Sequence, residues 1–241
     1  MRKIIFLFII SLFWGLPSFG FEKPYPSLIT PSQLDAQLWM TTFSHRFYGA
    51  LDNEPLENWF GMDGGSNTKM GIRYALLNEI DIQVSRTSKR KSFEGILRYT
   101  QMIQPNIPIM VAGLIDSYKD PSTQEQLTAS AAMAGINFSM LNDRLQLSSL
   151  LLYDNEIEKT GFGFGGSYQM TPDYHLYLEG YPTPFVSGNK ISYSWGIRYH
   201  TFGHRFLAYV ANNTEHSVRH QMNGVEKSTP YLGFKITRIL E

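Results

Sequence analysis

The 241-residue chain contains no cysteine. It can therefore form no disulfide, no thiolate-bound zinc or iron–sulfur centre and no cysteine nucleophile. It also lacks an excess of either charge, because 21 Lys and Arg residues balance 21 Asp and Glu residues. That balance argues against a nucleic-acid-binding protein, which normally carries a basic excess or stripe. Only 17% of the residues are charged and 43% are apolar, which is the composition of a folded chain rather than a disordered one.

Long apolar runs are missing after the first twenty residues. Residues 4–16 form an apolar run behind Arg2 and Lys3, and small residues close it up to Gly20. This pattern predicts a secretory signal peptide over residues 1–20, cleaved after Gly20. An N-terminal membrane anchor is the alternative, but the run is shorter than the roughly 20 residues that a spanning helix needs. The exported chain would lose two basic residues and become slightly acidic.

Two-residue alternation of apolar and small or polar residues is abundant in the rest of the chain. In one such run, Phe162, Phe164 and Tyr168 lie on the strand face opposite to glycine, serine and glutamine residues. Alternation of this kind indicates β-strands with one apolar face. Twelve strands are predicted, at residues 36–47, 68–76, 80–87, 92–103, 107–117, 126–140, 144–153, 160–170, 174–182, 191–200, 204–212 and 228–239. The inward faces of strands 126–140 and 204–212 stay undecided.

The connections between these strands alternate in length. Every second one is a tight turn, and most of the others are longer, with residues 88–91 as the short exception. An even number of strands, with short turns at one rim and long loops at the other, is typical of a bacterial outer-membrane barrel. The sequence therefore predicts an all-β, antiparallel up-and-down transmembrane barrel over residues 36–241, with periplasmic turns and termini. Residues 21–35 are predicted to be an irregular periplasmic lead-in or a small plug. A soluble β-sandwich or lipid-carrying barrel is the alternative.

Five short motifs carry a resemblance to a known group of proteins. They are an HRF motif at His45 to Phe47, FGxD at Phe60 to Asp63, RY at Arg73 and Tyr74, SR at Ser85 and Arg86, and EGxxRY at Glu94 to Tyr99. With these motifs, residues 44–101 resemble a family of uncharacterised single-chain outer-membrane β-barrels of Gram-negative bacteria, a domain of unknown function. The family has no established activity, so the resemblance implies a fold and a location but no catalytic residue.

The same resemblance implies two partners. One is the lipid of the outer membrane, and the other is the barrel-assembly machinery that inserts such proteins. This chain ends in Ile239, Leu240 and Glu241, whereas barrel proteins usually end in an aromatic residue. Use of the common insertion route is therefore implied less firmly than the fold.

Charged residues of inward parity predict the character of the lumen. Six are basic and three are acidic: Arg46, Lys69, Arg73, Arg98, Arg198 and Lys235, with Asp81, Glu94 and Glu179. Such an excess of positive charge between low-dielectric walls would favour small anionic solutes. A narrow, weakly anion-favouring pore is therefore predicted. The alternative is a closed structural or partner-docking barrel in which these ions pair across neighbouring strands.

The long loop at residues 48–67 is a second candidate site. Trp59, Phe60 and Asp63 are predicted to fold into the barrel mouth and narrow it, so that deletion of residues 52–64 would raise conductance. Acidic, glycine-broken loops can also hold Ca²⁺, but the EF-hand spacing is absent and no metal is predicted. No phosphate-binding, heme or other cofactor motif is present.

An outer-membrane enzyme is the least favoured alternative. A barrel lipase would need a His-x-Ser pair on one strand, because residues two apart point the same way. None of the six histidines has a serine two residues later. The sequence therefore predicts no catalytic residue.

Overall fold

The computed structural model describes residues 25–104, 107–120, 122–201 and 203–240. The predicted signal peptide, residues 1–20, lies outside the described residues, as do residues 21–24 of the predicted lead-in. Within the described ranges no helix is both long and apolar enough to cross a membrane.

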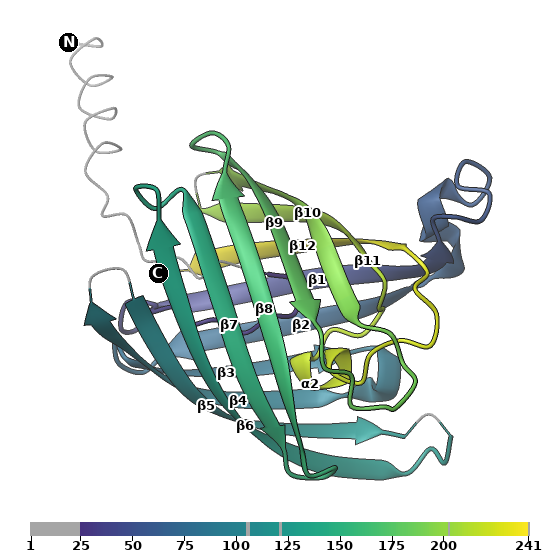
Figure 1. Ribbon diagram of the computed structural model, residues 1–241, viewed down its shortest axis with the longest axis horizontal. Helices are drawn as coiled ribbons and strands as arrows, with labels where there is room; N and C mark the ends of the chain where they lie inside the picture. The colour runs from purple at the N-terminus through teal and green to yellow at the C-terminus, as the bar shows by residue number, and fades with distance from the viewer. Residues whose placement is uncertain (1–24, 105–106, 121, 202, 241) are drawn as a thin grey trace, which may run out of the picture.

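Twelve antiparallel strands form a closed barrel, in which each strand pairs with its sequence neighbours and the first pairs with the last (Figure 1). The strands are β1 (Trp39–Ala50), β2 (Ser66–Ala75), β3 (Ile80–Thr87), β4 (Phe93–Gln104), β5 (Ile107–Lys119), β6 (Gln126–Met140), β7 (Leu145–Asp154), β8 (Lys159–Gln169), β9 (Tyr174–Tyr181), β10 (Ser192–Thr201), β11 (His204–Ala211) and β12 (Tyr231–Leu240). The predicted fold class and strand number are confirmed. β1 begins three residues later than predicted because Gln37, with a φ of 70°, lies in a turn.

Short and long connections lie at opposite ends of the barrel, as Figure 1 shows. The short turns, for example residues 76–79 and 170–173, share one end with the C-terminus. In the connections at the opposite end, the described residues form three short helices, which are η1 (Trp59–Gly64), η2 (Lys89–Lys91) and α2 (Val218–Gln221), with η2 in the one short connection there. Because outer-membrane barrels have short periplasmic turns, the long connections mark the outer end.

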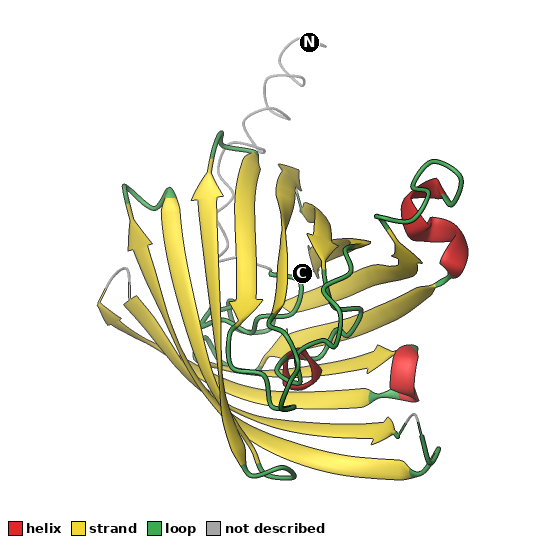
Figure 2. Cartoon of the chain, turned by 45° about the vertical axis from the view of Figure 1, so that its right-hand side comes forward, coloured by secondary structure: helices red, strands yellow, loops and turns green. Residues whose placement is uncertain are grey.

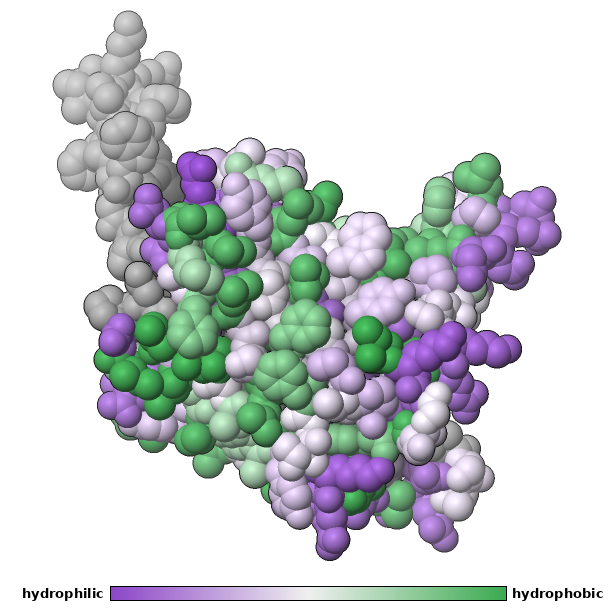
Figure 3. Space-filling model, in the orientation of Figure 1, coloured by the Kyte–Doolittle hydropathy of each residue, from purple (hydrophilic) through white to green (hydrophobic). Residues whose placement is uncertain are grey.

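The outward strand faces are apolar and exposed. Val84, Leu97, Ile115 and Trp195 are each more than 55% exposed, although such side chains are normally buried in water-soluble proteins. In Figure 3 the hydrophobic surface covers the strands, and hydrophilic residues gather at the end that carries the long connections. This is the surface that a barrel presents to lipid.

Aromatic rings lie on this surface near the short-turn end. Trp39 and Tyr74, on β1 and β2, have ring centroids 4.3 Å apart. Tyr174 and Tyr199, on β9 and β10, stack at 4.8 Å. Amphipathic rings prefer the membrane–water interface, so these pairs mark the inner rim of the apolar band.

Two segments occupy the interior of the barrel (Figure 2). Residues 25–34 enter it ahead of β1, and residues 212–222, which include α2, enter from the outer end. Tyr25 and Leu28 of the first segment pack in one cluster with Val218 and Met222 of the second. Of the two predicted alternatives for residues 21–35, a periplasmic lead-in or a small plug, residues 25–34 adopt the second, because they lie inside the lumen.

The inward face of β8 explains how the two segments fit. It carries Gly161, Gly163 and Gly165 at alternate positions. A Cβ atom at these glycines would lie 2.3 Å from Met222 Sδ, 2.9 Å from Leu28 Cδ1 and 2.7 Å from the Tyr25 ring, respectively. Any larger residue on this face would therefore collide with a lumen segment.

Candidate functional site

The nine predicted lumen residues all lie on the inner wall. Seven of them are at most 3% exposed and two are half-buried, in this order: Arg46, Arg73, Asp81, Glu94, Arg98, Glu179 and Arg198, then Lys69 and Lys235. The strand alternation places these charges inside, and the two lumen segments then remove them from water. Buried charges need compensating partners, so their contacts define the site.

Glu179 on β9 fixes the N-terminal plug, residues 25–34, to the wall. Its Oε2 atom accepts hydrogen bonds from the backbone N–H groups of Ser27 at 3.1 Å and Leu28 at 2.9 Å. Its Oε1 atom accepts from Ser194 Oγ at 3.0 Å and lies 3.8 Å from Arg46 Nη2. A buried carboxylate needs donors of this kind, and these contacts order the chain that supplies them.

Arg46 on β1 touches both lumen segments. It donates from Nη2 to Ser27 Oγ at 2.7 Å and from Nη1 to the Asn213 carbonyl at 2.8 Å. Its Nε atom donates to the Tyr209 hydroxyl at 3.2 Å. The planar guanidinium thus couples residues 25–34 to residues 212–222 across the barrel.

A second cluster lies nearer the short-turn end, where Arg73, Asp81 and Arg98 meet Thr30 and Ser32. Arg73 Nη2 lies 2.6 Å from Asp81 Oδ2, and Arg98 Nε lies 3.7 Å from Asp81 Oδ1. The plug adds neutral acceptors, because Arg73 donates to the Ser32 carbonyl at 2.7 Å and Arg98 to the Thr30 carbonyl at 3.4 Å. Glu94 and Arg98 lie roughly 13 Å apart along one strand, at about 3.3 Å per residue, and are too distant to pair. Arg98 therefore pairs with an acid on another strand.

The half-buried lysines complete the contacts of the predicted set. Lys69 Nζ lies 3.0 Å from Glu94 Oε1, and Glu94 also accepts from Ser217 Oγ at 2.5 Å. Lys235 Nζ donates to the Tyr25 carbonyl at 2.9 Å. Each lysine therefore lies beside one of the two lumen segments.

Arg198 on β10 differs from the other wall arginines. Among the described residues no carboxylate lies within 4 Å of its guanidinium, and its side-chain contact is with Ser167 Oγ at 3.3 Å. Its Nε atom is buried without a partner, and so are the hydroxyls of Tyr177 and Tyr181 on β9. Buried donors without acceptors are rare and mark places where water or an ion is held.

Two wall acids were missed by the sequence analysis. Asp116 on β5 and Asp154 on β7 are completely buried and face α2. His220 Nε2 lies 3.0 Å from Asp116 Oδ2, and Arg219 Nε lies 2.5 Å from Asp154 Oδ2. The sequence held a signal for Asp116, because it lies two residues after Leu114 and therefore on the same inward face of β5. These acids make the excess of basic charge in the lumen smaller than predicted.

The loop residues predicted to narrow the mouth lie elsewhere. Trp59 is 65% exposed, Phe60 is 45% exposed, and Asp63 is also exposed. Helix η1 instead packs on the end of β1, where a Cβ at Gly49 would lie 2.3 Å from Gly61 Cα, and it projects away from the barrel (Figure 1). The prediction of a constriction by this loop is therefore corrected, because residues 212–222 fill the mouth.

Burial sets the protonation of the second lumen segment. Burial lowers the pKa of His216 well below 6.5, and Arg46, Lys69 and Lys235 lower it further, so the ring is neutral. Its Nε2 atom lies 2.9 Å from the Asn67 carbonyl and donates to it.

Glu215, the residue before His216, behaves in the opposite way. Burial raises its pKa, but His220, Lys89 and Arg90 outweigh burial and hold this pKa below the ordinary value. Arg90 Nε lies 3.0 Å and Lys89 Nζ 3.1 Å from Glu215 Oε1. The segment is thus held by one neutral and one charged buried group.

A closed, lipid-facing barrel of twelve strands with a charged interior defines an outer-membrane β-barrel protein. Residues 33–240 match the family described as "Membrane bound beta barrel domain (DUF5777)", and the chain belongs to this family. No curated protein matches the chain in sequence.

Several solved structures share this fold. A KdgM porin aligns with a TM-score of 0.58 and 9% identity, covering 84% of this chain and 99% of the porin. A NanC porin aligns at 0.52 with 8% identity, covering 83% and 98%. A dimeric outer membrane phospholipase of Salmonella typhi with bound calcium aligns at 0.51 with 11% identity, covering 90% and 94%. Identities this low show a common fold, and the function of this chain must be argued from its own site.

Proposed function

We propose that the protein is a narrow outer-membrane channel that weakly favours small anions, and that the two lumen segments close it in the conformation described above. Arg198 carries the proposal. A buried guanidinium close to the unpartnered Tyr177 hydroxyl, with no carboxylate within 4 Å among the described residues, offers donors to which an anion can bind. Such donors in a low-dielectric lumen favour passage of negative charge.

The composition of the plug supports the same proposal. Residues 25–34 contain no charged side chain, and they satisfy the wall cations with carbonyl and hydroxyl oxygens alone. An anionic solute offers oxygens of the same kind and could replace the plug at those cations. A KdgM porin with this fold has been solved in complex with oligogalacturonate, whose name denotes a carboxylate-bearing sugar.

Planar bilayer recording in a salt gradient tests the proposal. We expect small current steps whose reversal potential shows a preference for anions. Arg198→Gln should reduce that preference, whereas Arg238→Gln, which changes an outward arginine on β12, should leave it unchanged. A preference for cations, or an unchanged preference in Arg198→Gln, would contradict the role proposed for the lumen.

One observation favours a second candidate, a closed barrel whose function lies in its outer loops. Both lumen segments are bound to the wall through buried contacts, with Glu179 and Arg46 at the centre. If a folded variant lacking residues 25–34 is as silent as the full chain, this second candidate replaces the channel. A lipase activity has less support, because no histidine has a serine two residues later.

A further inference from the structure

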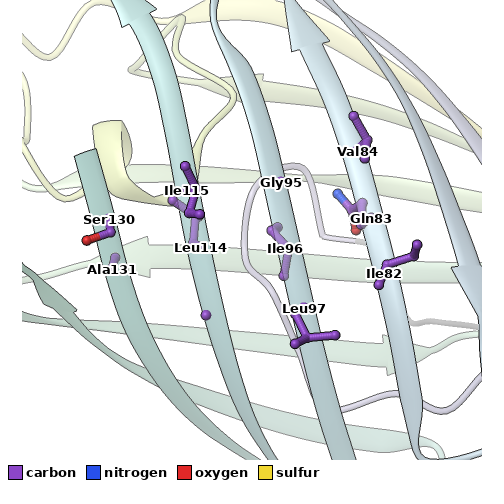
Figure 4. A pocket seen from close by; sticks show the side chains of 11 residues that line it. Ile82, Gln83, Val84, Gly95, Ile96, Leu97, Leu114, Ile115, Ser130 and Ala131 are labelled. Carbon is purple, nitrogen blue, oxygen red and sulfur yellow. The ribbon is translucent and has the colours of Figure 1, made fainter. Parts of the chain in front are cut away.

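A groove of about 520 Å³ runs over the outward face of β3 to β6 (Figure 4). Apart from Gln83 and Ser130 the residues that line it are apolar, and the large ones include Ile82, Leu97 and Ile115. It lies on the surface that faces lipid, so its occupant must be apolar.

Two glycines create the groove. Gly95 on β4 pairs with Val84 on β3 and with Ile115 on β5, and Gly113 on β5 pairs with Leu97. A Cβ atom at either glycine would meet no other atom within 4 Å. The branched side chains around them stand higher, so the two glycines form the open floor between apolar walls.

A basic residue lies at the outer end of the groove. Arg86 lies two residues beyond Val84 on the same face of β3, about 7 Å along the strand. Its guanidinium carbon lies 5.3 Å from the ring centroid of Phe93, which pairs with Arg86 across the strands. Phe93 lies two residues before Gly95 on the same outward face of β4. No acidic side chain pairs with Arg86 among the described residues.

The turn that follows Arg86 adds further positive charge. It contains Lys89, Arg90 and Lys91, of which Lys89 and Arg90 are paired with Glu215. Lys91 is exposed. The groove is thus apolar along its length and basic at its outer end, where the lipid head groups lie.

We propose that this groove binds one acyl chain of an anionic lipid, with the lipid phosphate held at Arg86 and Lys91. A lipid fits both halves of the site, since hydrocarbon fills the open floor and a phosphate meets the unpaired guanidinium. A second copy of the chain fits less well. In a two-fold dimer the groove would face its own copy, leaving two concavities unfilled and bringing the basic rims together.

Native mass spectrometry of the full chain, released from detergent with dioleoyl phosphatidylglycerol or dioleoyl phosphatidylcholine, tests the proposal. We expect one retained phosphatidylglycerol per barrel and weaker retention of phosphatidylcholine, which carries the same acyl chains. Arg86→Gln should weaken phosphatidylglycerol binding about fivefold, corresponding to about 1 kcal/mol for one basic residue at the membrane surface. Arg144→Gln, which changes an exposed arginine in the short turn before β7 and outside this groove, is the arginine control and should bind like the wild type.

Filling the groove tests the acyl part separately. Gly95→Leu and Gly113→Leu each place a side chain in open space and should lower retention of both lipids alike. Gly166→Leu, on the outward face of β8 and outside the groove, is the matched glycine control. Equal retention of the two lipids by the wild type, normal retention after either groove substitution, or a lipid-free dimer mass would overturn the proposal. A difference in gel mobility between heated and unheated samples shows whether a variant is folded. If one of the two groove variants does not fold, lipid retention by the other one tests the proposal.

Discussion

Glu179 joins the barrel wall to the N-terminal plug, because one of its oxygens accepts two backbone N–H groups and the other faces Arg46. In Glu179→Ala we expect the plug to detach and the conductance to rise. The buried Arg46 would lose its acid, which costs about 3–5 kcal/mol of stability when the lumen stays dry. Current steps in bilayers and guanidinium unfolding measure the two effects.

The matched control is Asp173→Ala, which removes an exposed carboxylate from a short turn. It should change neither conductance nor stability, because exposed charges contribute little. Glu179→Gln keeps one acceptor oxygen, so its conductance and its stability should both lie between those of the control and those of the alanine variant. An alanine variant that conducts like the wild type would show that Glu179 does not hold the plug.

At the scale of elements, residues 212–222 take the place in the mouth that the sequence predicts for the loop at residues 48–67. Helix η1 stands outside the mouth, and residues 212–222 lie within it. Deletion of residues 52–64 should therefore leave the conductance unchanged, whereas replacement of residues 216–221 by a glycine–serine linker should raise it. Single-channel recording of both variants checks this. A rise in conductance after deletion of residues 52–64 would show that Trp59 and Phe60 narrow the mouth after all.

The strands were predictable because period-two alternation is local and survives in any barrel. For residues 25–34 the sequence could not decide between a lead-in and a plug, because they have no period and their partners are distant in sequence. The signal for the plug lay elsewhere, in the inward glycines of β8, which make room for Tyr25 and Leu28. The same limit applies to the site. Parity places Arg198 inside the barrel, but its lack of an acidic partner among the described residues depends on how all twelve strands close.

At the scale of the whole molecule, closure of the outer end should depend on pH through His216. Buried beside the basic groups of β1, β2 and β12, this ring is neutral, and its pKa lies well below 6.5. Protonation therefore favours the displaced segment. The closed state is fully stable above about pH 6.5 and loses stability as the pH falls below that value. Glu215 stays ionised over this range because its pKa is held below 4.5.

We expect conductance to rise, and hydrogen exchange of residues 213–222 to accelerate, when the pH is lowered from about 7.5 to about 5.5. His216→Gln is the matched variant, because its amide can still donate to the Asn67 carbonyl but cannot gain a proton. Its conductance should be the same at both pH values. If wild type and variant respond alike, another group opens the barrel, and burial of His216 only packs the segment. If the variant alone is insensitive, a neutral ring at one position keeps the twelve-stranded barrel closed.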